Sequence, residues 1–196
     1  MKATFFERLG SYLVDTIVVS LIFSLICLGY GNYTTDTEKR MGELDEQLME
    51  KNITTEEYLE EYKDLFYDYQ KENVLQSGIS VALTIAYYVI FQYMNKGQTI
   101  GKKLLNIRIV DKDNEKPISI LKGLFRSLLV FNIISGILGI IFIYVLGKNT
   151  YFNAYGIVAG IETLFVIATI MFILYRKDHR GLHDIITNTI VIRESR

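Results

Sequence analysis

The sequence predicts an all-α integral membrane protein: a bundle of four transmembrane helices with an extracytoplasmic helical hairpin and a small cytoplasmic β-hairpin segment. One observation behind this prediction is that half of the 196 residues are hydrophobic and the mean hydropathy is positive. Another is that four apolar runs approach the roughly 20 residues that a helix needs to cross a bilayer core. The third is an uneven distribution of lysine and arginine between the loops that connect these runs. We expect a single membrane domain over residues 1–196.

The first apolar run, residues 9–30, contains a charge that hydrocarbon does not favour. Arg8 precedes the run, and Asp15 lies about two helical turns inside it. Placing a carboxylate inside a bilayer costs at least ~2.5 kcal/mol, so Asp15 needs a polar partner or a hydrated cavity. We expect that partner to be Arg126, which enters the third run at a similar depth. Asp15 is then either half of an ion pair that fixes helix register or a carboxylate that handles protons or cations.

Residues 31–72 form a polar, acidic insertion between the first two runs. This segment has thirteen acidic and five basic residues, a net charge of −8. Its apolar residues follow helical spacing, and Thr54 with Glu57 has the pattern of a capping box that begins a second helix. We therefore predict a helical hairpin, whose second arm continues unbroken into the next apolar run. Its charge makes either a solvated face or a vestibule that attracts cations.

The second run, residues 74–95, leads into the most basic stretch of the chain, residues 96–126. Residues 104–110 have the composition of a strand, and residues 118–120 follow a turn-rich segment, which predicts a short β-hairpin. The eight lysines and arginines of this stretch suit contact with anionic lipid headgroups. The segment 97–103 resembles a phosphate-binding loop, but its two glycines are too close together and Lys103 replaces the Ser or Thr of that motif.

The third and fourth runs cover residues 124–146 and 152–175. Glu162 lies near the middle of the fourth run, and Asn132 in the third is a candidate polar neighbour. An ionisable residue at this depth is a functional hypothesis by default. Glu162 is either a protonated group that hydrogen-bonds between helices or a proton-coupled site.

After the fourth run come two histidines and then a strand-like tail, residues 185–193. His179 and His183 have the i, i+4 spacing that shares a metal ion on a helix, but Gly181 interrupts that helix. Two histidines alone make a weak metal site. The favoured interpretation is a pair of juxtamembrane histidines, with Asp184 bonding to a basic loop.

The distribution of lysine and arginine predicts the orientation. Fifteen of these residues lie on one side if the N-terminus, residues 96–126 and the C-terminus share it, and six lie on the other. Because loops rich in lysine and arginine stay inside, we expect a multi-pass protein of the cell membrane with both termini in the cytoplasm.

The same residues limit the possible functions. The sequence offers no nucleophile, cofactor site or metal-ligand set, so we expect neither an enzyme nor a nucleic-acid-binding protein. One hypothesis is a small transporter or transporter subunit for cations, protons or an unidentified ligand, in which Asp15 and Glu162 bind the ion and Arg8 and Arg126 tune them. Four helices leave little room for a path, which favours a homo-oligomer or a membrane partner. The alternative is a non-transporting adaptor or stress-response protein that recruits partners through its acidic hairpin or basic segment.

The order of these motifs resembles that of the RDD family of bacterial membrane proteins, named for one arginine and two aspartates. The resemblance is carried by Arg8 and Asp15 in the first run, the Gly97–Asp111 segment, Arg126, and the Arg180–Asp184 segment. It implies that Arg8 and Asp15 are the first two signature residues and that Asp184, or else Asp111, is the third. It also implies a role in transport without naming a substrate. The acidic insertion is longer than the family pattern, so its role is not inherited.

Overall fold

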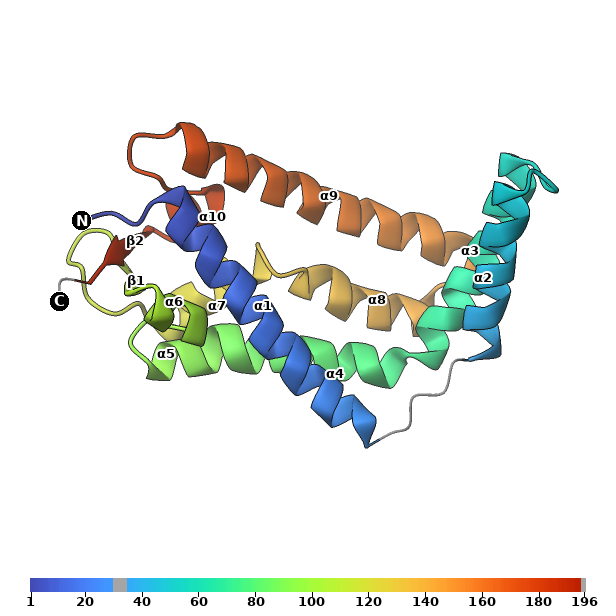
Figure 1. The fold of residues 1–196 in the computed structure, drawn as a ribbon, viewed down its shortest axis with the longest axis horizontal. Coiled ribbons are helices and arrows are strands. Elements are labelled where there is room, and N and C mark those ends of the chain that lie inside the picture. Colours follow the sequence, from blue (N-terminus) through green and yellow to red (C-terminus); the bar gives the residue numbers. More distant parts are fainter. Residues whose placement is uncertain (30–34, 195–196) are drawn as a thin grey trace.

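The computed structural model describes residues 1–29 and 35–194, which form mostly helices and one small sheet. Residues 30–34, which include the predicted end of the first run and start of the acidic insertion, lie outside the described residues, as do residues 195–196. Three helical stretches are long and apolar enough to cross a membrane: α1 (Phe5–Leu28), Val74–Met94 and α9 (Lys148–Tyr175). Both termini lie at one end of the molecule (Figure 1).

The second stretch contains an irregular turn that decides which side chains face inward. It consists of α4 (Val74–Ile85), the π-helical turn η1 (Ala86–Phe91) and α5 (Gln92–Met94). A π-helical turn holds an extra residue, and such turns often occur at functional sites. As a result, the consecutive residues Tyr87, Tyr88 and Val89 are all buried.

The third apolar run is broken, so the prediction of one continuous helix over residues 124–146 is wrong. The chain forms α7 (Ile120–Leu128) and α8 (Ile133–Val145), which meet at an angle of 68°. Asn132 precedes α8 with a φ of 53°, in the left-handed region that interrupts a helix and that asparagine tolerates. The molecule therefore has three candidate spans, or four if the bent pair counts as one.

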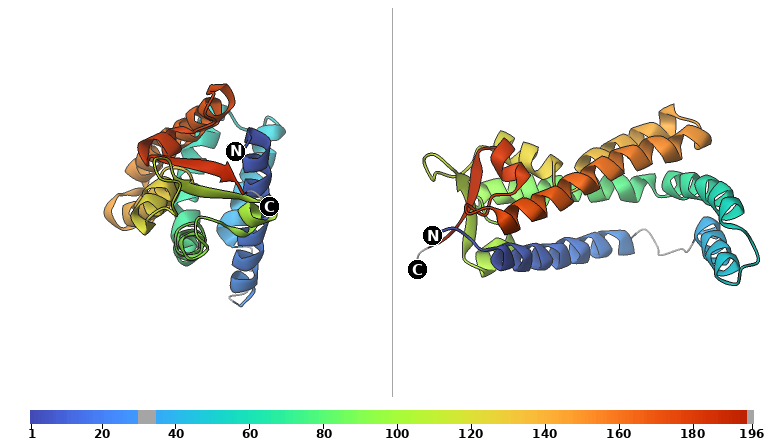
Figure 2. Two further views of the ribbon diagram at one scale, coloured as in Figure 1. Left: turned by 90° about the vertical axis from the view of Figure 1, so that its left-hand side faces the viewer. Right: turned by 90° about the horizontal axis from the view of Figure 1, so that it is seen from above.

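The acidic segment forms the expected helical hairpin, α2 (Asp36–Met49) and α3 (Thr55–Glu72), at the end opposite the termini (Figure 2). The predicted capping box at Thr54 is present, with Glu57 bonding back to its backbone. The expectation of an unbroken second arm is wrong: α3 ends before Asn73, and the chain changes direction into α4 (Figure 1). The Tyr67 hydroxyl anchors α3 by donating to the Ile143 carbonyl, 3.1 Å away.

The sheet pairs two strands that lie far apart in the sequence, and this pairing was not predicted. Strand β1 (Ile107–Asp111) pairs antiparallel with β2 (Thr189–Arg193), with Ile109 opposite Val191. The predicted β-hairpin is wrong, because Pro117 makes only an isolated bridge to Val110. Proline lacks the amide proton that a paired strand needs. The strand-like tail takes that place. The short helices α6 (Ile100–Leu104) and α10 (Leu182–Ile186) flank the sheet, whose core is Ala3, Ile107, Ile109, Ile118 and Val191.

Candidate functional site

Asp15 is the centre of a hydrogen-bonded cluster that joins α1 to the segment after α5. Its side chain is 1% exposed. It accepts hydrogen bonds from the Tyr87 hydroxyl at 2.7 Å, the Thr99 hydroxyl at 2.6 Å and the Gly101 amide at 2.7 Å. The Lys102 ammonium lies 3.8 Å from the same carboxylate. Asp15 is thus fully supplied with donors and one positive charge, which is how a protein offsets the cost of burying a carboxylate.

The segment that binds Asp15 is the one that resembles a phosphate-binding loop. Thr99 caps the first turn of α6, so its hydroxyl and the following amides point at α1. At Gly101 an added Cβ would lie 2.2 Å from the Ser11 carbonyl oxygen, so only glycine permits this approach. The spacing of the glycines in this segment excluded a phosphate-binding loop, so Thr99, Gly101 and Lys102 were not predicted as site residues. The motif does hold an anion, but the anion is a carboxylate of the same chain.

Asp184 is the centre of a second cluster, which joins three distant parts of the chain. It is fully buried and accepts from Arg8 Nη1 at 2.7 Å and from the Gly181 amide at 3.0 Å. Arg126 Nη1 also donates to it, on the other carboxylate oxygen. Arg180 does not contact the Asp184 carboxylate but donates a hydrogen bond to the Asp184 backbone carbonyl at 2.9 Å. One carboxylate thereby links the start of α1, the end of α7 and α10.

This arrangement corrects the expected pairing of Asp15 with Arg126. Arg126 pairs with Asp184, and the positive partner of Asp15 is Lys102. Of the two aspartates considered for the third signature position, Asp184 contacts Arg8, whereas Asp111 pairs with Lys122 at the far edge of β1.

Burial and charge shift the pKa values of the ionisable groups outside the spans. Burial alone would raise the pKa of Asp184, but attraction to Arg126 and Arg8 outweighs it and holds that pKa well below its usual value. Burial lowers the pKa of His183 to about 4, against the opposing effect of Asp184. It also lowers the pKa of Lys102 to about 8, partly offset by Asp15. At neutral pH, His183 is therefore neutral and Lys102 is mostly charged.

A cavity of about 310 Å³ adjoins both clusters on the side of the termini. Its polar lining residues are Arg8, Ser11, Asp15, Lys102, Arg126, Thr169 and His183, of which three carry a positive charge and one a negative charge. The rest of its wall is apolar and comes mainly from α1, α9 and the break between α7 and α8: Phe5, Leu9, Tyr12, Val130, Phe131, Val166, Ile170 and Ile173. Together they form a pocket with a cationic head and an apolar body.

Glu162 lies on α9 beside the beginning of α8. One carboxylate oxygen accepts a hydrogen bond from the Ser135 amide at 3.1 Å. This amide is in the first turn of α8, where backbone N–H groups have no partner within the helix. The other oxygen is buried with no hydrogen-bond partner among the described residues. The expected neighbour Asn132 instead directs its backbone carbonyl to the Ser135 hydroxyl, at 3.1 Å. Glu162 and Asp15 therefore belong to separate groups rather than to one ion site.

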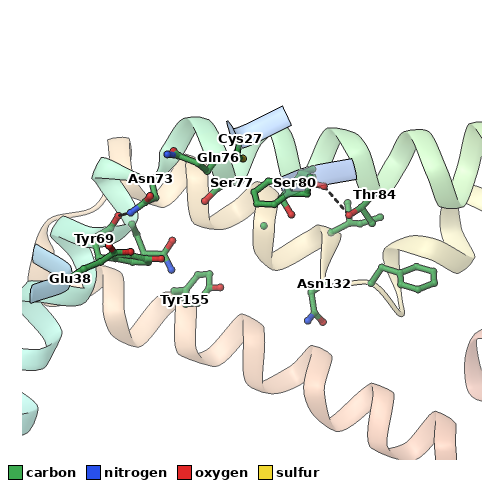
Figure 3. A pocket seen from close by; sticks show the side chains of 16 residues that line it. Cys27, Glu38, Tyr69, Asn73, Gln76, Ser77, Ser80, Thr84, Asn132 and Tyr155 are labelled. Carbon is green, nitrogen blue, oxygen red and sulfur yellow. Dashed lines mark hydrogen bonds between the residues drawn. The ribbon is translucent and has the colours of Figure 1, made fainter. Parts of the chain in front are cut away.

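A second cavity, of about 900 Å³, opens toward the helical hairpin. Figure 3 shows its polar side chains, which come from α4 and from the ends of the neighbouring helices. They are Glu38, Asn73, Gln76, Ser77, Ser80, Thr84 and Asn132. Polar groups on apolar helices suit a water-filled space rather than lipid contact.

Phe131, in the break between α7 and α8, lines both cavities. Its ring stacks on Tyr88 with the centroids 3.7 Å apart, and the Tyr12 ring lies 6.3 Å away on α1. Tyr88 is held inward by the π-helical turn. An aromatic pair therefore lies where the polar cavity and the cationic pocket approach each other.

The two histidines have different surroundings. His183 is buried beside Asp184, with its Nε2 3.4 Å from the carboxylate, whereas His179 Nδ1 lies 3.1 Å from the Ile173 carbonyl. Across residues 1–29 and 35–194, no three His, Cys, Asp or Glu side chains converge to hold a metal ion.

A comparison with family models matches residues 2–188 to the RDD family. The chain belongs to the RDD family. Its long apolar helices make it a multi-pass membrane protein. Comparisons with curated proteins and with solved structures gave no significant match. In this RDD protein, two of the proposed signature residues, Arg8 and Asp184, touch each other, while Asp15 organises a separate cluster through α6.

Proposed function

We propose that this RDD protein is a small membrane transporter. Its path runs from the polar cavity of about 900 Å³ beside the helical hairpin, past Phe131, into the cationic pocket of about 310 Å³. The observation that carries this proposal is the position of Phe131 in the wall of both cavities. Moving one aromatic ring would connect the two spaces. The stacked Tyr88 keeps them apart in the present conformation.

The broken helix supports the same proposal. Transporters commonly bind their substrates where a membrane helix is interrupted, because the free backbone groups at the break can hold polar cargo. The chain is interrupted in this way between α7 and α8. Asn132, at this break, has a left-handed backbone conformation and lines the polar cavity. If the break served only to bend the helix, we would not expect a polar cavity to extend to it.

In this proposal Glu162, which contacts the beginning of α8 beside the path but lines neither cavity, is the carboxylate that binds a proton or cation during transport. Its second oxygen lacks a partner among the described residues, so it has capacity for a proton or an ion. Asp15 has less free capacity, because three donors and Lys102 already surround it. The ion-handling role thus passes from the pair Asp15 and Glu162 to Glu162 alone.

The test is a flux measurement on purified protein in liposomes that contain a pH-sensitive dye. After a sodium or potassium gradient is imposed, the wild type should change the internal pH, and Glu162→Gln should not. Phe131→Ala should raise the rate, because the smaller side chain leaves the two cavities connected.

Two control variants accompany the flux measurement. Phe172→Ala removes an equally large ring from the exposed face of α9, and Glu61→Gln neutralises an exposed acid on α3. Both should match the wild type. Equal flux in wild type, Phe131→Ala, Glu162→Gln and protein-free liposomes contradicts the proposal.

The adaptor hypothesis remains the second candidate because the hairpin is built as a fixed projection. Besides the Tyr67 contact, Lys148 pairs with Asp68 at 2.6 Å, so α3 is tied to the start of α9. The hairpin of α2 and α3 lies at the end of the molecule opposite the termini (Figure 2). Loss of a co-purified partner on deleting residues 36–72, with flux absent from the intact protein, would favour this function.

A further inference from the structure

Arg8 lines the cavity of about 310 Å³, and one edge of its guanidinium has no hydrogen-bond partner among the described residues. Arg8 gives only Nη1 to Asp184, at 2.7 Å. Its Nε and Nη2 atoms are buried and have no hydrogen-bond partner among the described residues. These two nitrogens form one side of the planar guanidinium, which is the fork that binds carboxylates and phosphates in a bidentate manner. The side chain is only 10% exposed, so leaving these donors empty is costly.

We propose that the cavity binds an amphipathic anion, a single hydrocarbon chain with a carboxylate or phosphate head, with the head on the free edge of Arg8. This inference goes beyond the proposed transport function, since binding requires no flux. The cavity volume of about 310 Å³ lies at the lower end of the range of about 300–1,000 Å³ typical of small-molecule sites.

The charges around the head position favour an anion. Arg8, Arg126, Lys102 and Asp15 line this end of the cavity, and Asp184 pairs with Arg8 and Arg126 from outside its lining. Three cations against two anions leave one positive charge in excess, in a site where His183 is neutral. Uncompensated charge inside a low-dielectric site is expensive, and a single anionic head would neutralise it.

Thr169 and His183 also line the cavity. The Thr169 hydroxyl and His183 Nδ1 are buried and lack hydrogen-bond partners among the described residues. A hydroxyl can donate to a head-group oxygen, and so can a neutral imidazole whose proton is on this nitrogen. Buried polar groups normally have partners, so several free ones around one cavity indicate a missing ligand.

The body of the cavity suits a hydrocarbon chain. Its walls are Leu9 and Tyr12 of α1 on one side and Val166 and Ile170 of α9 on the other. Leu9, Tyr12 and Ile170 are also exposed on the apolar surface of these helices. A chain that entered between α1 and α9 would therefore remain in contact with hydrocarbon. A free inorganic anion would leave these apolar walls uncovered.

The test is native mass spectrometry of the full chain released from uncharged maltoside micelles. Palmitate or hexadecyl phosphate should bind at one molecule per chain. Hexadecanol lacks the charge, and inorganic phosphate lacks the chain, so each should bind at least about tenfold more weakly, a difference of about 1.4 kcal/mol or more. A two-chain phosphatidylglycerol should not displace palmitate.

Three variants locate the site. Arg8→Lys keeps a positive charge for Asp184 but loses the free edge, and it should weaken palmitate binding about tenfold or more. Val166→Phe fills the apolar body, leaves every ion pair in place and should also weaken binding. Lys103→Gln removes an exposed charge next to the site and should bind as the wild type does.

The Val166 variant decides the result if Arg8→Lys does not fold. The inference is overturned if neither single-chain anion binds the wild type, or if every folded cavity variant binds as tightly as the wild type. It is also overturned if inorganic phosphate or the two-chain lipid competes on equal terms. Flux can persist or fail independently of these results, so the transport proposal is judged separately.

Discussion

At the scale of single residues, the two buried aspartates solve the same problem in different ways. Asp15 is surrounded mainly by neutral donors, with Lys102 at 3.8 Å. Asp184 is held between Arg8 and Arg126. The first arrangement ties one helix to an adjacent loop, and the second ties three separate segments together. Replacing either carboxylate would leave buried donors or cations unpaired, which is the expensive outcome.

Because burial lowers the pKa of His183, we expect the free energy of unfolding to depend on pH. Its folded-state pKa of about 4 lies below the ordinary value of 6.5, so the unfolded chain takes up a proton first as the pH falls. Stability should therefore be complete above pH 6.5 and fall by about 2 kcal/mol between pH 6.5 and pH 5. Thermal unfolding in detergent across this range would measure the effect.

A matched pair of variants isolates this effect. His183→Gln should remove most of the decline, because glutamine has no proton to take up. His179→Gln should leave the decline unchanged, since His179 lies apart from the cluster and contacts the Ile173 carbonyl. An identical pH profile in wild type and His183→Gln would show that other groups cause the decline.

At the scale of elements, short irregular pieces position the site more than the long helices do. The five residues of α6 present Thr99 and Gly101 to Asp15. The π-helical turn directs Tyr87 and Tyr88 inward, and the break before α8 places Phe131 between the cavities. The long apolar helices form the scaffold, and the polar and aromatic groups of the site are positioned by these short irregular segments.

The contact between α1 and α6 predicts the effect of a single methyl group. In Gly101→Ala the new Cβ would lie 2.2 Å from the Ser11 carbonyl oxygen and 2.9 Å from the Asp15 carboxyl carbon. The backbone must separate to accept it, at a cost of about 1–3 kcal/mol. Thermal unfolding in detergent would measure this loss.

Gly42→Ala is the control for this substitution. Gly42 lies within α2, and nothing stands within 4 Å of an added Cβ there. Because alanine is the better helix former, this variant should be as stable as the wild type or gain up to about 1 kcal/mol. Equal stability of Gly101→Ala and Gly42→Ala would refute the close approach of α6 to α1.

At the scale of the whole molecule, opposite charges gather at opposite ends. The end with the termini holds the basic stretch and both aspartate clusters, and the other end holds the acidic hairpin (Figure 1). Because lysine and arginine are retained inside, the end with the termini should face the cytoplasm.

Single cysteines would test this orientation. In a Cys27→Ser background, Glu46→Cys places a thiol on the exposed face of α2, and Lys112→Cys places one in the turn after β1. A membrane-impermeant maleimide should label Glu46→Cys in intact cells and Lys112→Cys only after permeabilisation. The reverse labelling pattern would invert the proposed topology.

The sequence was sufficient for features that depend on local pattern. Three of the four apolar runs located candidate spans to within about four residues, and Thr54 with Glu57 marked the beginning of α3. It was not sufficient for contacts between distant segments. Arg8 and Asp184 are 176 residues apart, and the partner of β1 comes from the tail rather than from its neighbour in sequence. Periodicity carries no information about such pairings.

The site residues divide in the same way. Arg8, Asp15 and Arg126 were identified because charges next to or inside apolar runs are conspicuous, whereas Asp184 was implied by the family resemblance. Thr99 and Gly101 were missed, because a hydroxyl and a backbone amide gain importance only once a carboxylate is brought to them. The break in the third run was missed because its only local sign is one asparagine in an apolar sequence.

The link between Arg8 and Asp184 has a consequence for the synthesis of the protein. A ribosome that adds about 5–20 residues each second needs roughly 9–35 s to add the 176 residues from the one after Arg8 to Asp184. Throughout that interval the arginine at the start of α1 lacks its native counter-ion, so the newly inserted helices cannot yet close around it. Assembly of this end of the molecule must therefore follow translation of nearly all the helices.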